Sequence, residues 1–122
     1  MSYHNDAPYI KHILDSINDI EESIKSLTKQ QFKKNKDVKD ATIRRLEVIG
    51  EAVKNISGKT KRKYSEIEWV KIAGTRDILI HKYFGVDADI VWNIVKKDLP
   101  DLKREVQIIL KALETKAIRK SR

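Results

Sequence analysis

The densest group of reactive side chains in this sequence lies between residues 76 and 83. It holds the guanidinium of Arg76, the carboxylate of Asp77, the imidazole of His81 and the phenol of Tyr83. On a helix that turns about 100° per residue, taking Arg76 as zero, Asp77 lies at about 100°, His81 at about 140° and Tyr83 at about 340°. Asp77 and His81 are four residues apart and therefore neighbours, so the carboxylate can orient the imidazole or raise its pKa.

An imidazole and a guanidinium suit chemistry at a phosphate, because histidine can move protons near neutral pH and arginine can stabilise developing charge. Arg76 and His81 do not share a helix face. They meet if the long arginine side chain reaches around, if the helix ends near His81, or if both face a second subunit across a two-fold axis. On spacing alone, surface charge for Arg76 and Asp77, a helix-end position for His81 and a core position for Tyr83 is the commoner outcome.

The other candidate residues indicate no metal or cofactor chemistry. His4 and His12 are eight residues apart, which does not match the spacing that puts two metal ligands on one helix face. There is no cysteine, so thiol, zinc-ribbon and iron–sulfur chemistry are excluded. The four glycines form neither a phosphate-binding loop nor a nucleophile elbow. We therefore expect no cofactor and no metal site.

Two further pairs of residues have ordinary explanations. Glu47 and Glu51 lie four apart on one helix face and could take part in a cleft, but a solvated or ion-paired face is the commoner use of such a pair. Trp69 and Trp92 could stack on bases, yet aromatic residues beside apolar stripes usually pack in the core. Both pairs stay outside the proposed site.

Composition predicts one basic domain. A chain of 122 residues falls in the usual size range of a single domain, 1–122. The formal net charge of +8 favours an anionic partner such as nucleic acid or an acidic protein, and 19 of the 26 basic residues are lysine, which suits contacts to a phosphate backbone. Apolar runs are short and the first residues lack a signal-peptide pattern, so we expect a cytoplasmic protein with no membrane contact.

Apolar residues recur in steps of three and four, which predicts amphipathic helices. The first helix starts at Pro8, and a connection follows at Lys29–Lys36 with Asn35 or Asp37 as the next cap. The stripes of the four predicted helices are Ile10, Ile13, Ile17, Ile20, Ile24 and Leu27; Ala41 or Thr42, Leu46, Ile49, Val53 and Ile56; Trp69, Ile72, Ala73, Ile80 and Tyr83; and Ile90, Val91, Ile94 and Val95, continued by Leu102, Val106, Ile109, Leu110 and Leu113.

Local signals set the expected boundaries. Gly58 and Gly85 should end the second and third helices, and the basic run Lys59–Lys63 should be a loop. Ser65-Glu-Ile-Glu68 has the spacing of a capping box at the start of the third helix.

The last helix should begin at a cap from Asp87 or Asp89. It should kink or restart at Pro100, and the basic tail 115–122 should fray. No segment alternates with period two. The prediction is an all-α, up-and-down four-helix bundle with a kinked or broken last helix.

The string Arg76-x4-His81-x-Tyr83 resembles the signature of HEPN-domain toxins of the HepT type. The surroundings agree in order: Arg45-Leu-Glu-Val-Ile-Gly-Glu-Ala52, then Trp69 to Gly74, Tyr83-Phe-Gly-Val-Asp87, and Val91-Trp92 through Leu99-Pro100. The similarity runs from about residue 8 to 113. Many relatives have Asn after the motif arginine, where this chain has Asp77 as a supporting polar residue.

The resemblance implies a homodimer with a composite cleft, acting as a metal-independent endoribonuclease toxin on RNA with Arg76 and His81 as catalytic residues. It also implies an MntA-type minimal nucleotidyltransferase as the antitoxin, which silences the toxin by transferring AMP to Tyr83. The alternative is a non-catalytic HEPN partner that binds RNA or a nucleotide while the nucleotidyltransferase does the chemistry. A titrating histidine in the motif favours the enzyme.

Overall fold

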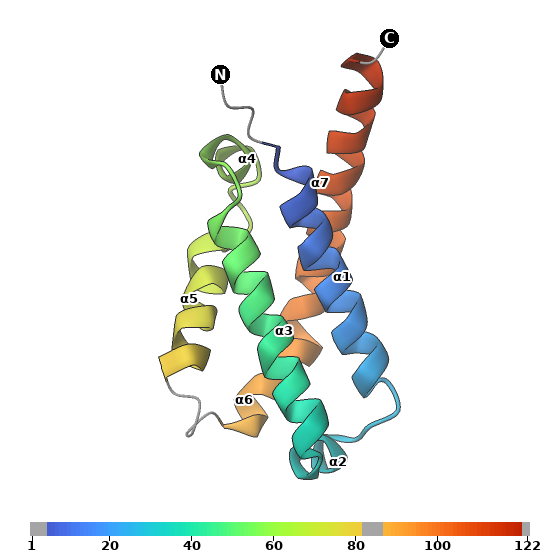
Figure 1. Cartoon of the computed structure of the whole chain (residues 1–122), viewed down its shortest axis with the longest axis vertical. Helices are drawn as coiled ribbons and strands as arrows, with labels where there is room; N and C mark the ends of the chain where they lie inside the picture. Colours follow the sequence, from blue (N-terminus) through green and yellow to red (C-terminus); the bar gives the residue numbers. More distant parts are fainter. Residues whose placement is uncertain (1–4, 82–86, 121–122) are drawn as a thin grey trace.

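The computed structural model describes residues 5–81 and 87–120, which are almost entirely helical (Figure 1). The four long helices are α1 (Ala7–Ile24), α3 (Lys36–Lys54), α5 (Trp69–His81) and α7 (Leu99–Lys120). They run alternately down and up, and no strand occurs within these two ranges, so the predicted all-α, up-and-down bundle is confirmed. The short elements are α2 (Lys29–Lys34), α4 (Gly58–Lys63), α6 (Ala88–Asn93) and the π-helical turn η2 (Ile94–Asp98).

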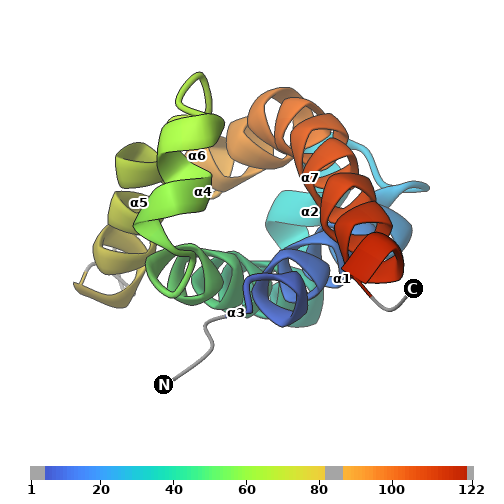
Figure 2. The same ribbon diagram turned by 90° about the horizontal axis from the view of Figure 1, so that it is seen from above.

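The long helices follow one another around the bundle in the order α5, α3, α1, α7 (Figure 2). Helix α1 presents an almost unbroken row of isoleucines to its neighbours, because steps of three and four residues keep them on one face. An ion pair of 2.7 Å between Lys103 Nζ and Glu21 Oε1 also joins α7 to α1. The buried core consists of Ile10, Ile13, Ile17, Ile20, Ile24, Phe32, Ile43, Leu46, Ile49, Ala52, Val53, Ile56, Ile67, Trp69, Val91, Val95, Leu99, Leu102, Val106 and Ile109.

Two segments predicted as connections form short helices instead. In α2, the Thr28 hydroxyl accepts from Gln31 N at 3.1 Å and the Gln31 side chain accepts from Thr28 N at 2.9 Å, which is a complete capping box. Asn35 then caps α3 as predicted, accepting from Val38 N. The basic run Lys59–Lys63 lies in α4, where three cations in the last turn suit the helix dipole.

The predicted boundaries around Gly58 and Ser65 are wrong. Helix α3 ends at Lys54, and Gly58 is the first residue of α4, with no left-handed conformation. Ser65 lies in a turn that buries Ile67, and α5 begins only at Trp69. In this turn the backbone amide of Ile67 donates to Tyr64 O at 3.1 Å. Ser65 lies four residues before the first residue of α5, so it is not at the helix start and does not cap it.

The last part of the chain largely follows the prediction. Asp87 caps α6, with its carboxylate accepting from Asp89 N at 2.8 Å. The helix widens at η2, where Leu99 N–H donates to Ile94 O five residues back, just before Pro100, which has no amide hydrogen. Residues 115–120, part of the tail expected to fray, remain helical in α7, since most are residues of good helix propensity.

Gly85 lies outside the described residues. Within residues 5–81 and 87–120, no helix combines the length and the apolar character needed to cross a bilayer.

Candidate functional site

Helix α5 carries three of the four motif residues. Arg76, Asp77 and His81 all lie within Trp69–His81, whereas Tyr83 lies outside the described residues. Five residues separate Arg76 from His81, so their positions differ by about 140° around the helix and by about 7.5 Å along it. The structure thus confirms the helical setting of Arg76, Asp77 and His81 but does not put positions 76 and 81 on one face.

Packing fixes the orientation of α5. Trp69 is buried and its Nε1 donates to Tyr64 O at 3.1 Å, while Ile72 packs against the core beside it. About 100° further around the helix, Val70 is 88% exposed. Position 76 lies about 20° from Trp69 around the helix, and position 81 lies about 20° from Val70. Around the helix, position 81 is therefore in register with exposed Val70 and position 76 with buried Trp69.

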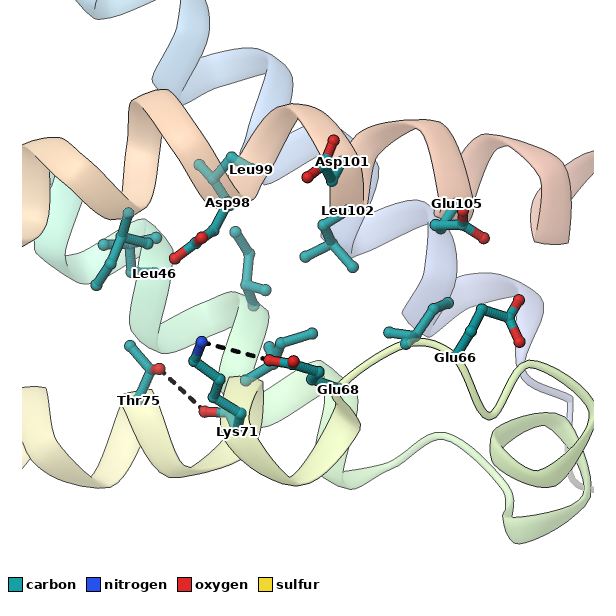
Figure 3. A pocket seen from close by; sticks show the side chains of 14 residues that line it. Leu46, Glu66, Glu68, Lys71, Thr75, Asp98, Leu99, Asp101, Leu102 and Glu105 are labelled. Carbon is teal, nitrogen blue, oxygen red and sulfur yellow. Dashed lines mark hydrogen bonds and ion pairs between the residues drawn. The ribbon is translucent and has the colours of Figure 1, made fainter.

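A groove lies between α5 and the start of α7, and its rim is acidic. Figure 3 shows carboxylates on both banks, Glu66 and Glu68 on one and Asp98, Asp101 and Glu105 on the other. The groove has a volume of about 380 Å³ and an apolar floor that includes buried Leu46 and Leu102. Among the described lining residues Lys71 is the basic one, and its Nζ is paired with Glu68 Oε2 at 3.3 Å. We call this feature the acidic groove; its charge repels phosphate.

A smaller hollow of about 330 Å³ lies between α1 and α3. Exposed His12 lines it together with Glu47 and Glu51, the two glutamates that lie four residues apart on α3. Glu47 accepts from Arg44 Nη1 at 3.3 Å, which confirms the ion-paired helix face for this residue. Among the described residues, no group of three or more histidines and carboxylates is arranged to hold a metal ion.

Both tryptophans pack as predicted. Trp69 belongs to the core, and the ring of Trp92 lies 5.2 Å from that of Phe32, centroid to centroid, at a tilt of 44°. The Nζ atom of Lys96 lies 4.9 Å from the centroid of the Trp92 ring. Neither tryptophan is an open stacking platform.

An alternating bundle with Arg-x4-His on its third long helix defines an all-α protein of the HEPN-like class. The family model described as "Ribonuclease HepT-like" matches residues 13–109, which is most of the chain. The chain therefore belongs to the HepT-like family.

Curated relatives agree with this assignment. The chain is 49% identical over 106 residues to "Gamma-glutamylcyclotransferase and putative RNase" of Methanocaldococcus jannaschii, covering 87% of this chain and 48% of that longer protein. It is 41% identical over 109 residues to a "Putative RNase" of the same organism, covering 89% of this chain and 100% of the relative. It is 43% identical over 103 residues to "Probable ribonuclease HepT" of Thermococcus cleftensis, covering 84% and 94%. No solved structure gives a significant match.

Proposed function

We propose that this protein is an endoribonuclease whose reaction uses Arg76 and His81. Membership of the HepT-like ribonuclease family is the observation that carries the proposal, and relatives of similar length are named as RNases. The placement of both residues on α5 supports it, because one helix carries the guanidinium and the imidazole. Asp77, four residues before His81, is the supporting polar residue.

The chemistry follows from these two side chains. The 2′-hydroxyl attacks the adjacent phosphorus and loses its proton, and the 5′-oxygen leaves as it gains one. His81 can move protons at these oxygens, since an imidazole titrates near neutral pH. Arg76 can stabilise the extra negative charge of the pentavalent phosphate. Side chains of this protein can therefore supply both the proton transfers and the charge stabilisation, and we propose that the reaction is independent of metal.

The test is RNA cleavage in EDTA. Wild-type protein should cut RNA, whereas His81→Ala and Arg76→Ala should each lower the rate at least 100-fold, in keeping with the usual contributions of proton transfer and charge stabilisation. Lys97→Ala removes an exposed cation from η2 and is the matched control, with activity within two-fold of wild type. Equal cleavage by all four proteins would point to a contaminating nuclease. RNA binding without cleavage would favour the alternative of a non-catalytic module.

We further propose that the enzyme is the toxin of a toxin–antitoxin pair and that an MntA-type nucleotidyltransferase silences it by transferring AMP to Tyr83. The support is the motif itself, because Tyr83 follows His81 by two residues. A phosphate-bearing adduct on the phenol would place negative charge next to the site that must bind the scissile phosphate. The cytoplasmic location stays a prediction.

Intact mass after co-expression with such a nucleotidyltransferase tests this control. Wild-type protein should gain one or more AMP units and lose RNase activity. Tyr83→Phe lacks only the acceptor hydroxyl, so it should gain none and stay active. Tyr64→Phe is the matched control and should be modified like wild type. Modification that maps to Tyr9 or Tyr64 would contradict the assignment.

A further inference from the structure

The short helix α4 is a concentrated positive charge that the proposed reaction does not use. It carries Lys59, Lys61, Arg62 and Lys63 and no acidic residue. Lys61 is half-buried and the other three are exposed. Lys61 and Arg62 also line a surface depression of about 760 Å³, together with Glu68 and with Val70 and Lys71 of α5, and Lys71 is paired with Glu68. A positively charged surface that follows the phosphate backbone is one part of how proteins bind single-stranded nucleic acid.

Partly buried hydrogen bonds hold α4 in place. Ser57 caps the helix, its hydroxyl accepting from Thr60 N at 3.3 Å. The carboxylate of Asp6, at the start of α1, accepts from Ser57 N at 2.9 Å and from Ser57 Oγ at 2.6 Å, and also from the Thr60 hydroxyl. Asp6 is 7% exposed. The cations of α4 therefore sit on a fixed platform, which lowers the entropic cost of binding a ligand there.

Helix α5 runs from the region of α4 to the motif. Val70, Gly74 and position 81 lie within about 40° of one another around the helix, and position 81 is about 16 Å beyond Val70 along it. We call this strip the outer face of α5. A Cβ atom built at Gly74 would meet no atom within 4 Å, so the middle of the outer face is open. A chain of nucleotides can lie along it between α4 and position 81.

Charge disfavours the other side of α5. The acidic groove runs along that side with five carboxylates on its rim, and a polyphosphate would be repelled there. The ion pair of Lys71 and Glu68 stands between the two features, since both residues line the groove and the depression beside α4. A nucleic acid that approaches α5 is thus directed to the outer face.

We propose that α4 and the outer face of α5 form a binding track for single-stranded RNA, on which Lys61 and Arg62 contact phosphates and Val70 supports a base. The identity of the ligand rests on the proposed function. The track adds a surface that binds the RNA at nucleotides distant from the cleaved bond. Its cations bind the RNA and take no part in the chemical step. They should govern how tightly long RNA binds and should leave the chemical step unchanged.

Binding is measured on the His81→Ala background, where the RNA stays intact. A fluorescent 12-nucleotide oligouridylate is titrated with full-length protein at several salt concentrations. Lys61→Ala/Arg62→Ala should weaken binding at least ten-fold at low salt and should reduce the slope of log K against log salt by about 1.4, which is two phosphate contacts on a single strand. Lys97→Ala/Lys111→Ala removes the same charge from exposed positions on η2 and α7, and its slope should stay close to that of the parent. Equal slopes for the two double variants would overturn the track.

Gly74 gives a second test that does not depend on charge. Gly74→Leu fills open space on a helix and replaces a poor helix former, so the fold should be at least as stable as wild type. The leucine should nevertheless obstruct the track and weaken oligouridylate binding about ten-fold. Gly74→Ala adds only one carbon and should bind nearly like wild type. Unchanged binding by Gly74→Leu would show that RNA does not follow the outer face.

Kinetics separate this proposal from the proposed function. On an otherwise wild-type background, Lys61→Ala/Arg62→Ala should raise KM for long RNA and leave kcat within about two-fold. Cleavage of a dinucleotide too short to reach α4 should be unaffected. If no protein cleaves RNA but the binding differences hold, the track stands and the nuclease fails. If cleavage needs His81 but both α4 variants behave like wild type, the nuclease stands and the track fails.

Discussion

At the scale of single residues, Asp6 ties together parts of the chain that are far apart in sequence. Its carboxylate accepts two hydrogen bonds from Ser57 and one from Thr60, which lie 51 and 54 residues away. Asp6→Ala would leave three donors without their acceptor in a largely buried site. We expect the free energy of unfolding to fall by about 3 kcal/mol. Urea denaturation measures this loss.

The controls separate the carboxylate from a general effect of charge. Asp6→Asn keeps one acceptor oxygen and should lose less stability than Asp6→Ala. Asp15→Ala removes an exposed carboxylate from the same helix and should change the unfolding free energy by less than about 0.5 kcal/mol. A loss in Asp6→Ala no greater than that in Asp15→Ala would show that the three hydrogen bonds contribute little.

Local spacing explains which residue roles the sequence could predict. Arg76, Asp77 and His81 are close in sequence, so their setting on one helix followed from periodicity alone. The ion pair of Glu47 follows in the same way, because Arg44 lies three residues before it. Asp6 gave no comparable signal, since its partners come from a distant segment that the sequence alone does not bring near.

At the scale of elements, length decides what periodicity can detect. The long helices show several turns of an apolar stripe, and α1 was predicted almost to its ends. Helices α2 and α4 have six residues each, too few for a stripe, and both depend on their caps. Thr28-x-x-Gln31 and Ser65-x-x-Glu68 have the same capping-box spacing, yet only Thr28 caps a helix. Ser65 instead lies in the turn after α4, where Ile67 is buried.

Helices α2 and α6 are joined by an ion cluster with a definite pH dependence. Asp89 Oδ1 lies 3.0 Å from Lys29 Nζ and 3.4 Å from Lys33 Nζ. The hydrogen bond from Lys29 lowers the pKa of Asp89 below its ordinary value of 3.8, against partial desolvation, which raises it, and with further help from Lys33. A carboxylate with a lowered pKa stabilises the fold fully above its unfolded pKa, and this contribution is lost as pH falls through the folded pKa.

Thermal unfolding of wild type and Asp89→Asn as a function of pH tests the cluster. The wild-type protein should be the more stable by a constant margin between pH 5 and pH 7, and the margin should shrink below about pH 4. Asp15→Asn, at an exposed position on α1, should show no such trend. A margin that grows on acidification would contradict the direction of the pKa shift.

At the scale of the whole molecule, the net charge of +8 is unevenly distributed, because one surface is basic and another is acidic. The basic helix α4 lies at the N-terminal end of α5, and the acidic groove lies along one side of α5. Net charge predicted an anionic partner but not where it binds. The groove could not be predicted, because its banks come from residues 66–68 and 98–105, which only the packing of α5 and α7 brings face to face.

The arrangement of α5 also bears on the number of subunits in an active enzyme. Positions 76 and 81 are about 140° apart around the helix, so one copy of α5 does not align them. We predict a homodimer in which Arg76 of one subunit works with His81 of the other. Light scattering should then give twice the chain mass of 14.2 kDa, and a monomer at micromolar concentration would contradict it.

Mixed dimers test the shared site directly. Arg76→Ala and His81→Ala proteins, each inactive alone, are unfolded together and refolded as a mixture. In a mixed dimer with shared sites, one site lacks both groups and the other has both intact. Random pairing makes about half of the dimers mixed, with one working site in two, so the mixture should regain about a quarter of wild-type RNase activity. If each site instead uses Arg76 and His81 of the same chain, no pairing restores a complete site and the mixture stays inactive.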